Sequence, residues 1–226
     1  MPSRDPNDLH PGLIETPTHE SNYGNGRGDA GRNLGRRFII LHGSGKHPTA
    51  TAAQELAYLQ TPGIRVSYHA YATKDGALHQ LVPFGARAWH AGSSRWREYE
   101  DLNDLSIGIA FESTNATDEA YPPAQVGAVF ELVRDLMTAF DIPPTRVLTH
   151  KEVSYPQGRK VDPVNFDIDA FRARLEKPRP DPMEPMLDAE RLYIMKGGMV
   201  YKAYHLDHKR PARVVNGKLY ANIVEQ

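Results

Sequence analysis

The chain has 226 residues, 40% hydrophobic and 24% charged, which is enough for one domain of ordinary size with a small appendage. Its formal net charge of -1 provides no overall basic field, so we expect neither nucleic acid nor an anionic membrane surface as a partner. Because cysteine is absent, disulfides and thiolate zinc sites are excluded, and any metal must be held by histidine and carboxylate side chains.

Residues 1–35 are rich in Gly, Asn, Asp and Arg and carry few apolar side chains. Such a segment cannot bury enough surface to offset the entropy of ordering it, so we expect a flexible leader. It contains no apolar core of a signal peptide, and no run in the chain is long and apolar enough to span a bilayer. We therefore expect a protein that is cytoplasmic as synthesised, with no membrane span.

Ordered structure is expected to begin at Phe38–Leu41, a short apolar run that ends in small residues and is typical of a buried strand. Residues 50–59 favour a helix. The runs at 66–73 and 77–84 are joined by a segment that contains Asp75-Gly76, which predicts a β-hairpin.

Residues 106–113 form another buried-strand candidate, and residues 146–150 a short last strand. Between them, the apolar residues of 123–140 recur at helical spacing and predict one amphipathic helix. A closing helix is expected at 168–176. The order of strands and helices predicts an α/β fold with a mixed central β-sheet flanked by helices.

The C-terminal part of the chain differs in composition. Four prolines fall between Pro178 and Pro185, so we interpret residues 178–190 as a linker. Residues 191–226 contain two β-rich runs with turn signals at Gly197-Gly198 and Asn216-Gly217. We expect a small β-rich appendage there.

Three candidate metal ligands stand at the ends of predicted elements. His42 ends the first strand, His150 ends the strand at 146–150, and Asp162 follows in a loop bounded by Gly and Pro. Two imidazoles and one carboxylate suit zinc with a fourth position left for water. From position alone, structural histidines satisfied by hydrogen bonds are an equal alternative.

The run from Phe38 to about Leu175 resembles the type 2 N-acetylmuramoyl-L-alanine amidase family. That family includes bacteriophage lysozyme-type amidases, cytosolic anhydro-muramyl amidases and animal peptidoglycan recognition proteins. The resemblance implies a zinc amidase-like catalytic domain over residues 36–177. Four segments carry it, in the family order: FIILHGSG, VSYHAYATKDGALHQLVPFGARAWHAGSSRW, NDLSIGIAFES and LTHKEVSYPQGRKVDP.

The resemblance places Zn²⁺ ligands on His42, His150 and Asp162. It also places Lys160 beside the reacting carbonyl, where a cation can stabilise the oxyanion that forms when water attacks the amide. The alternative for Lys160 is a solvated surface charge.

Tyr68, in the SYH motif, matches the tyrosine that positions water or stabilises the intermediate in phage-type members. The anhydro-muramyl amidases instead use a glutamate as general base at the position that is Ala110 here, a departure from their pattern. Glu112 lies two residues further along the same strand face and is a second candidate base. A hydrogen-bonded core tyrosine is the alternative for Tyr68.

The resemblance adds His69, Trp89, His90 and Asn103 as groups around a substrate groove. The ring of Trp89 could cover a sugar face. His69 and His90 could equally be packing residues, and Asn103 could equally be a turn residue.

The function implied is zinc-dependent hydrolysis of the amide between N-acetylmuramic acid and L-alanine in peptidoglycan, as in a lysin. One alternative is a cytosolic amidase that acts on soluble anhydro-muropeptides, and another is a non-catalytic peptidoglycan-binding module. Hydrolysis of intact peptidoglycan fits release to the cell wall as a phage-type lysin. Hydrolysis of soluble anhydro-muropeptides fits an enzyme that stays inside the cell.

Overall fold

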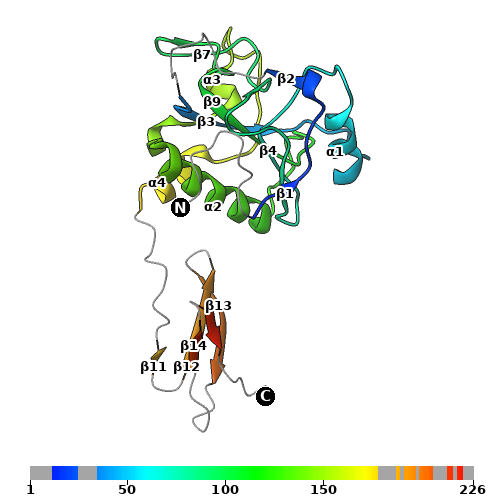
Figure 1. Ribbon diagram of the computed structural model, residues 1–226. Coiled ribbons are helices and arrows are strands. Elements are labelled where there is room, and N and C mark those ends of the chain that lie inside the picture. Colours follow the sequence, from blue (N-terminus) through cyan, green and yellow to red (C-terminus); the bar gives the residue numbers. More distant parts are fainter. Residues whose placement is uncertain are drawn as a thin grey trace. The chain divides into compact units, whose positions relative to one another are not determined.

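The computed structural model describes residues 12–24 and 35–177, together with the backbone of five strands nearer the C-terminus. The chain divides into two compact units, Met1–Glu176 and Lys177–Gln226 (Figure 1).

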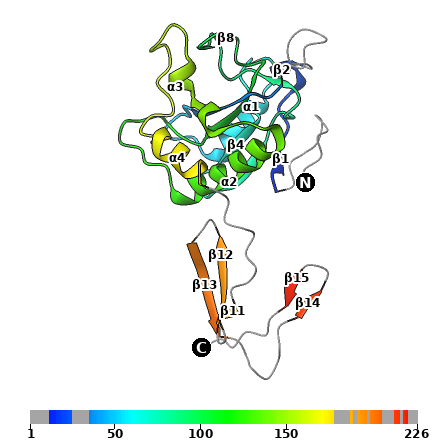
Figure 2. The ribbon, with the colours of Figure 1, turned by 90° about the vertical axis from the view of Figure 1, so that its left-hand side faces the viewer.

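A six-stranded sheet forms the centre of the first unit (Figures 1 and 2). Its strands are β1 (Ile14–Glu15), β3 (Phe38–Gly43), β4 (Ala70–Ala72), β5 (Leu78–Gln80), β9 (Ser106–Phe111) and β10 (Val147–Thr149). They lie in the order β1-β5-β4-β9-β3-β10. Only β4 and β5 pair antiparallel within this sheet, and the other neighbours are parallel. The sheet is therefore mixed, which confirms the prediction from the order of elements.

Strands β3 and β9 lie side by side in the middle of the sheet, and every residue of both is buried. Because both faces of such parallel strands are covered, they consist of nearly continuous apolar runs. Side chains alternate between the faces, so Ile39 and Leu41 pack into one core cluster while Phe38 and Ile40 pack into another. By this alternation His42 lies on the face of Phe38 and Ile40, and the register places it opposite Ala110.

Helices cover both faces of the sheet. α2 (Pro123–Phe140) and α4 (Ile168–Leu175) lie on one face, and their buried residues join Ile39 and Leu41 in the larger core cluster (Figure 2). α1 (Ala52–Gln60) contributes Leu56 and Leu59 to a separate cluster that contains Ala110. The apolar stripe predicted for 123–140 thus forms the buried side of α2.

Two short helical elements flank β10, the edge strand that leads to His150. A 3-10 turn, η2 (Pro144–Arg146), leads into β10, and α3 (His150–Val153) follows it directly. His150 is therefore the first residue of a helix and not the last residue of a strand as the sequence suggests. The Thr149 side chain accepts a hydrogen bond from the Glu152 N–H, and the Glu152 carboxylate accepts one from the Thr149 N–H, so a capping box starts this turn.

The expectation of a flexible leader is wrong for residues 12–24. β1 pairs with β5, η1 (Glu20–Asn22) follows, and β2 (Tyr23–Gly24) pairs with β6 (Arg87–Ala88). The buried Asn22 donates from Nδ2 to the Thr61 carbonyl at 2.8 Å. Residues distant in the sequence thus provide hydrogen-bond partners for the polar groups of this segment and hold it in place. Residues 1–11 and 25–34 lie outside the described part of the chain.

The remaining strands form hairpins. β4 and β5 are joined at Asp75-Gly76 as expected, and Gly76 has the positive φ of 91° that such a turn needs. A small hairpin, β7 (Arg95–Trp96) with β8 (Tyr99–Glu100), lies outside the main sheet. No helix within the described residues is long and apolar enough to cross a membrane.

The second unit contains five short β-strands within its described residues, and the appendage stays a prediction. Strands β11 to β13 form an antiparallel sheet, and β14 pairs antiparallel with β15. Most of the predicted linker, 178–190, lies outside the described residues, but two of its residues form β11. The strands are β11 (Leu187–Asp188), β12 (Arg191–Lys196), β13 (Met199–His205), β14 (Arg213–Val215) and β15 (Lys218–Tyr220).

Candidate metal centre

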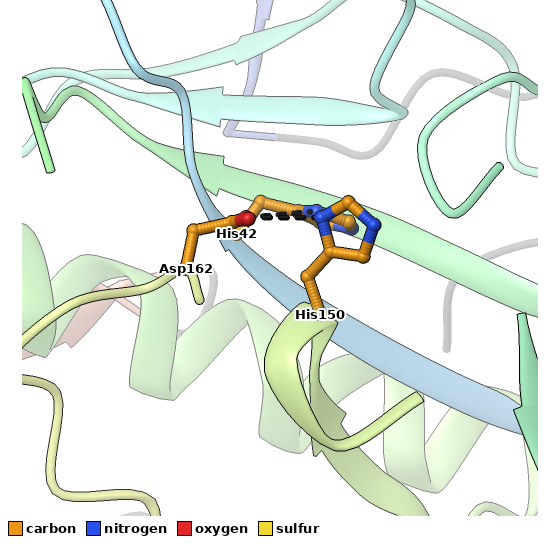
Figure 3. A group of neighbouring side chains, drawn as sticks. All are labelled: His42, His150 and Asp162. Atoms are coloured by element: carbon orange, nitrogen blue, oxygen red, sulfur yellow. Dashed lines mark hydrogen bonds and ion pairs between the residues drawn. The ribbon is translucent and has the colours of Figure 1, made fainter. Parts of the chain in front are cut away.

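The three predicted ligands converge from separate elements. His42 lies near the end of β3, His150 is the first residue of α3, and Asp162 lies in the loop before α4. One potential ligand atom from each lies within 4.8 Å of the others, and all three residues are buried. Figure 3 shows the side chains pointing toward one another.

Asp162 faces the two imidazoles through one oxygen. Its Oδ2 lies 3.1 Å from Nδ1 of His150 and 3.5 Å from Nδ1 of His42. The ring centroids of His42 and His150 are 4.6 Å apart. Two Nδ1 atoms and one carboxylate oxygen therefore face a common point.

The far nitrogen of each imidazole contacts another group. Nε2 of His150 lies 3.1 Å from the carbonyl oxygen of Ala91, which can only accept, so a metal bound at Nδ1 would leave the ring proton on Nε2. Nε2 of His42 lies 3.0 Å from Nδ1 of His90. The buried Nδ1 of His42 makes no hydrogen bond to any residue that the structure describes.

An orphaned buried nitrogen beside a carboxylate is the arrangement that a bound cation completes. Two imidazoles and one carboxylate fit zinc, and three protein ligands leave a position open, as catalytic zinc sites require. The donor set thus fits the metal that the sequence predicts, although the ligand roles of these residues stay predictions.

The protonation states favour metal binding. Burial lowers the pKa of His42 to about 4, and the nearby His150 adds to this effect, while Asp162 opposes it. Burial alone would raise the pKa of Asp162, but the two imidazoles that face its carboxylate outweigh this effect and hold the pKa well below its usual range. At neutral pH the site therefore presents a neutral His42 and a carboxylate, the forms that bind a metal.

Lys160 and Tyr68 both lie near the three candidate ligands. Lys160 is exposed, and its charge contributes to the lowered pKa of His42. The ring of Tyr68 lies 5.3 Å from that of His42, centroid to centroid. Burial and the Asp162 carboxylate raise the pKa of Tyr68, so its hydroxyl stays protonated at neutral pH and can donate a hydrogen bond.

Glu112 belongs to a different polar group. Its Oε2 accepts a hydrogen bond from the backbone N–H of Lys74 at 2.9 Å, and its Oε1 lies 3.9 Å from Nζ of Lys46. Its role as a candidate base stays a prediction, which these contacts do not favour. Ala110, opposite His42 in the sheet, offers no polar group in its place.

His69 is fully buried, and both ring nitrogens are engaged. Nδ1 accepts a hydrogen bond from the Gly108 N–H at 2.9 Å, and Nε2 lies 3.2 Å from the Ala86 carbonyl. This placement favours the packing alternative over the predicted substrate contact. Trp89 is half-buried, and the guanidinium of Arg65 lies over its ring, 5.5 Å from the centroid, so its predicted contact with a sugar stays a prediction.

His90 and Asn103 are also buried, at 6% and 5% exposure. Oδ1 of Asn103 accepts hydrogen bonds from the backbone N–H groups of His90 and Ala91, at 3.0 and 2.8 Å. These contacts favour a structural part for both residues over the predicted substrate contacts. The part played by the Ala91 carbonyl was not foreseen, because a backbone atom carries no side-chain signal in a sequence.

The fold is thus that of a mixed α/β protein in which two imidazoles and a carboxylate converge beside a buried strand, a donor set that suits a divalent metal. The family model Amidase_2, described as N-acetylmuramoyl-L-alanine amidase, matches residues 32–165. The chain belongs to this family.

Curated relatives match the same region. The chain is 38% identical over 111 residues to the 1,6-anhydro-N-acetylmuramyl-L-alanine amidase AmpD of Salmonella typhimurium (strain LT2), covering 49% of this chain and 57% of that protein. It is 40% identical over 93 residues to the N-acetylmuramoyl-L-alanine amidase AmiD of Escherichia coli (strain K12), covering 38% of this chain and 33% of that protein. The chain thus spans less than two thirds of the length of these relatives.

Solved structures share the fold. The crystal structure of a selenomethionine AmpD derivative superposes with a TM-score of 0.57 at 28% identity, covering 73% of this chain and 95% of that chain. A mutant endolysin from Bacillus subtilis, 22% identical, superposes with a TM-score of 0.53 and covers 72% of this chain and 97% of its own. The second likeness concerns the fold alone.

Proposed function

We propose that this chain hydrolyses the amide bond between N-acetylmuramic acid and L-alanine in peptidoglycan, with zinc held by His42, His150 and Asp162. The observation that carries the proposal is the convergence of three ligand atoms within 4.8 Å in a member of the N-acetylmuramoyl-L-alanine amidase family. Retention of the full ligand set argues against a non-catalytic binding module.

Zinc bound at this site would supply Lewis-acid chemistry, which polarises the scissile carbonyl and acidifies water. The exposed ammonium group of Lys160 stabilises the negative charge that develops on the carbonyl oxygen. The protonated hydroxyl of Tyr68 donates a hydrogen bond that orients the attacking water or binds the tetrahedral intermediate.

A second candidate substrate is a soluble anhydro-muropeptide. The observation that favours it is the relative named 1,6-anhydro-N-acetylmuramyl-L-alanine amidase, which is 38% identical to this chain over the matched region. Both substrates contain the same scissile amide and differ in the sugar. Cleavage of intact peptidoglycan fits release to the wall as a phage-type lysin, and cleavage of the soluble form fits action in the cytoplasm.

Mass spectrometry of the products tests the proposal. Purified sacculi and soluble anhydro-muropeptides are digested side by side by the zinc-loaded protein. The proposal expects free stem peptides that begin with L-alanine, and the faster of the two digestions identifies the preferred substrate. His150→Ala should release no peptide and retain little zinc. Cleavage at another bond, or unchanged cleavage by His150→Ala, would contradict the proposal.

We also propose that residues 36–177 form the catalytic domain, that 178–190 form a linker, and that 191–226 form the β-rich appendage. The division of the chain after Glu176 supports this arrangement. Residues 12–24 pair with β5 and β6, so they accompany the catalytic domain.

A further inference from the structure

We propose that His90 is a positioning residue, which accepts a hydrogen bond from Nε2 of His42 and so keeps the Nδ1 lone pair of His42 directed at the metal. This inference rests on the metal site proposed above. It assigns to His90 a part inside the protein in place of a contact with substrate, and its exposure of 6% agrees with that.

A chain of hydrogen bonds leads from His42 into the protein. Nε2 of His42 lies 3.0 Å from Nδ1 of His90, and Nε2 of His90 lies 3.3 Å from Oγ of Ser106. The Ser106 hydroxyl in turn donates to the backbone carbonyl of Leu102. All four groups are buried.

The Leu102 carbonyl determines which atom donates in each hydrogen bond of this series. Because the Leu102 oxygen can only accept, it takes the single hydroxyl proton of Ser106, and the Ser106 oxygen then accepts from Nε2–H of His90. In a neutral imidazole the other nitrogen is an acceptor, so Nδ1 of His90 takes the proton of Nε2–H of His42. The remaining lone pair of His42 is on Nδ1, the atom that faces Asp162.

Close packing restricts the His90 ring. Gly108 lies behind it in β9, and a Cβ at that residue would come within 2.4 Å of Cγ of His90. Asn103 anchors the backbone at His90 and Ala91, because its Oδ1 accepts from both N–H groups. The Ala91 carbonyl accepts from Nε2 of His150, so two consecutive residues hold both imidazoles of the candidate metal centre.

Groups that orient metal-binding imidazoles raise metal affinity, and their loss costs about 10- to 100-fold. The test is the zinc dissociation constant of the full chain, measured by competition with a chromogenic chelator. His90→Leu removes the acceptor and is expected to weaken binding by that factor. His90→Asn restores an acceptor oxygen near the place of Nδ1 and is expected to bind within a few-fold of the unaltered protein.

Thr18→Val is the matched control, because it removes buried hydrogen bonds to Leu59 and Asn22. Thr18 makes none of the hydrogen bonds that link His42, His90, Ser106 and the Leu102 carbonyl. It should leave zinc affinity unchanged. Equal affinity in His90→Leu and the unaltered protein, or equal weakening in the Leu and Asn variants, would overturn the proposal.

The tautomers provide a second readout that needs neither a variant nor a metal. Nitrogen NMR of the metal-free protein at neutral pH should show both His42 and His90 protonated at Nε2. A proton on Nδ1 of His90 would overturn the proposal even if zinc binds. If the tautomers are as expected but no zinc binds, the metal site fails while the hydrogen-bond chain stands.

Discussion

Lys160 and Tyr68 border the candidate ligands with different physical properties. Lys160 offers an exposed positive charge, and Tyr68 offers a buried hydroxyl whose raised pKa keeps it protonated. A cation is suited to stabilising an oxyanion that forms during the reaction, and a neutral donor is suited to orienting a water molecule. The two side chains therefore supply complementary functions beside one metal position.

Replacing Lys160 with alanine should slow turnover about 10²- to 10³-fold, because one electrostatic donor to the transition state is lost. Zinc content should stay unchanged, since the three ligands remain. Peptide release and metal content are measured on the same preparation. Lys151→Ala removes another exposed lysine nearby and should have little effect. Wild-type turnover in Lys160→Ala would disprove the assigned role.

Gly108→Ala should destabilise the protein by about 1–3 kcal/mol, because Gly108 lies in a buried strand and the added Cβ would overlap the His90 ring. Gly127, within α2, is the matched control: apart from its chain neighbours and the backbone of its own helix, no heavy atom lies within 4 Å of a Cβ placed there. Gly127→Ala should stabilise the protein by about 0.5–1 kcal/mol through helix propensity. Urea unfolding measures both, and a neutral Gly108→Ala would contradict the tight packing of His90.

At the scale of elements, the single turn of α3 holds one of the candidate ligands. Arg172 of α4 donates from Nη2 to both carboxylate oxygens of Glu152, at 2.7 and 2.8 Å, and from Nε to the Val147 carbonyl. Glu152 also closes the capping box with Thr149. One carboxylate thus joins β10, α3 and α4, and it fixes the direction in which His150 leaves the backbone.

Thr149→Ala should lower the free energy of unfolding by about 1 kcal/mol through loss of the N-cap, and it should also weaken zinc binding. Thr51→Ala removes the equivalent capping box of α1, which carries none of the candidate ligands. It should cost similar stability and leave zinc binding unchanged. Urea unfolding and chelator competition measure the two effects, and identical zinc affinities in both variants would show that α3 does not position His150.

The loop between β9 and α2 depends on Glu119. Its carboxylate accepts hydrogen bonds from Thr114 N–H, Ser113 Oγ and Lys74 Nζ, at 2.7, 2.8 and 2.7 Å. Burial alone would raise the pKa of Glu119, but these donors lower it from 4.5 to about 2. The charged form therefore stabilises this loop.

Because the pKa is lower in the folded state, the contribution of Glu119 is present above pH 4.5 and is lost as the pH falls toward about 2. Glu119→Gln should be less stable than the unaltered protein at pH 7, by about 2 kcal/mol. The difference should shrink progressively below pH 4.5. Unfolding measured across this range tests the prediction, and a difference independent of pH would contradict it.

At the scale of the whole molecule, the chain combines an α/β unit that carries every candidate site residue with a β-rich unit that carries none. The N-terminal residues 12–24 belong structurally to the first unit, since β1 and β2 extend its strands and Ser67 donates to the Asn22 carbonyl at 2.7 Å. The two ends of the chain should therefore respond differently to truncation.

Ending the chain after Lys177 should leave the thermal transition of the first unit and the cleavage of soluble substrate nearly unchanged. Removing residues 1–24 instead should lower the transition temperature, because β1, β2 and the buried Asn22 are lost. Calorimetry and peptide release measure both. Loss of folding after C-terminal truncation would contradict the proposed domain boundary.

The sequence by itself determined the elements whose signals are local. The apolar run Phe38–Leu41, the stripe of α2 and the turn at Asp75-Gly76 all formed where expected, because burial and backbone preference act there over a few neighbouring residues. The motifs that carry the family resemblance also pointed to the three residues whose ligand atoms converge.

Only the tertiary structure decided the partners of buried polar groups. The leader residues 12–24 have too few apolar side chains to predict order. In the structure, β5 and β6 provide hydrogen-bond partners for the backbone of this segment, and the Thr61 carbonyl accepts from the side chain of Asn22. The same holds for His90, whose histidine signal in the sequence suits a substrate contact and a structural residue equally. Its hydrogen bonds to His42 and Ser106 span 48 and 16 residues, and such pairings exist only once the sheet has assembled.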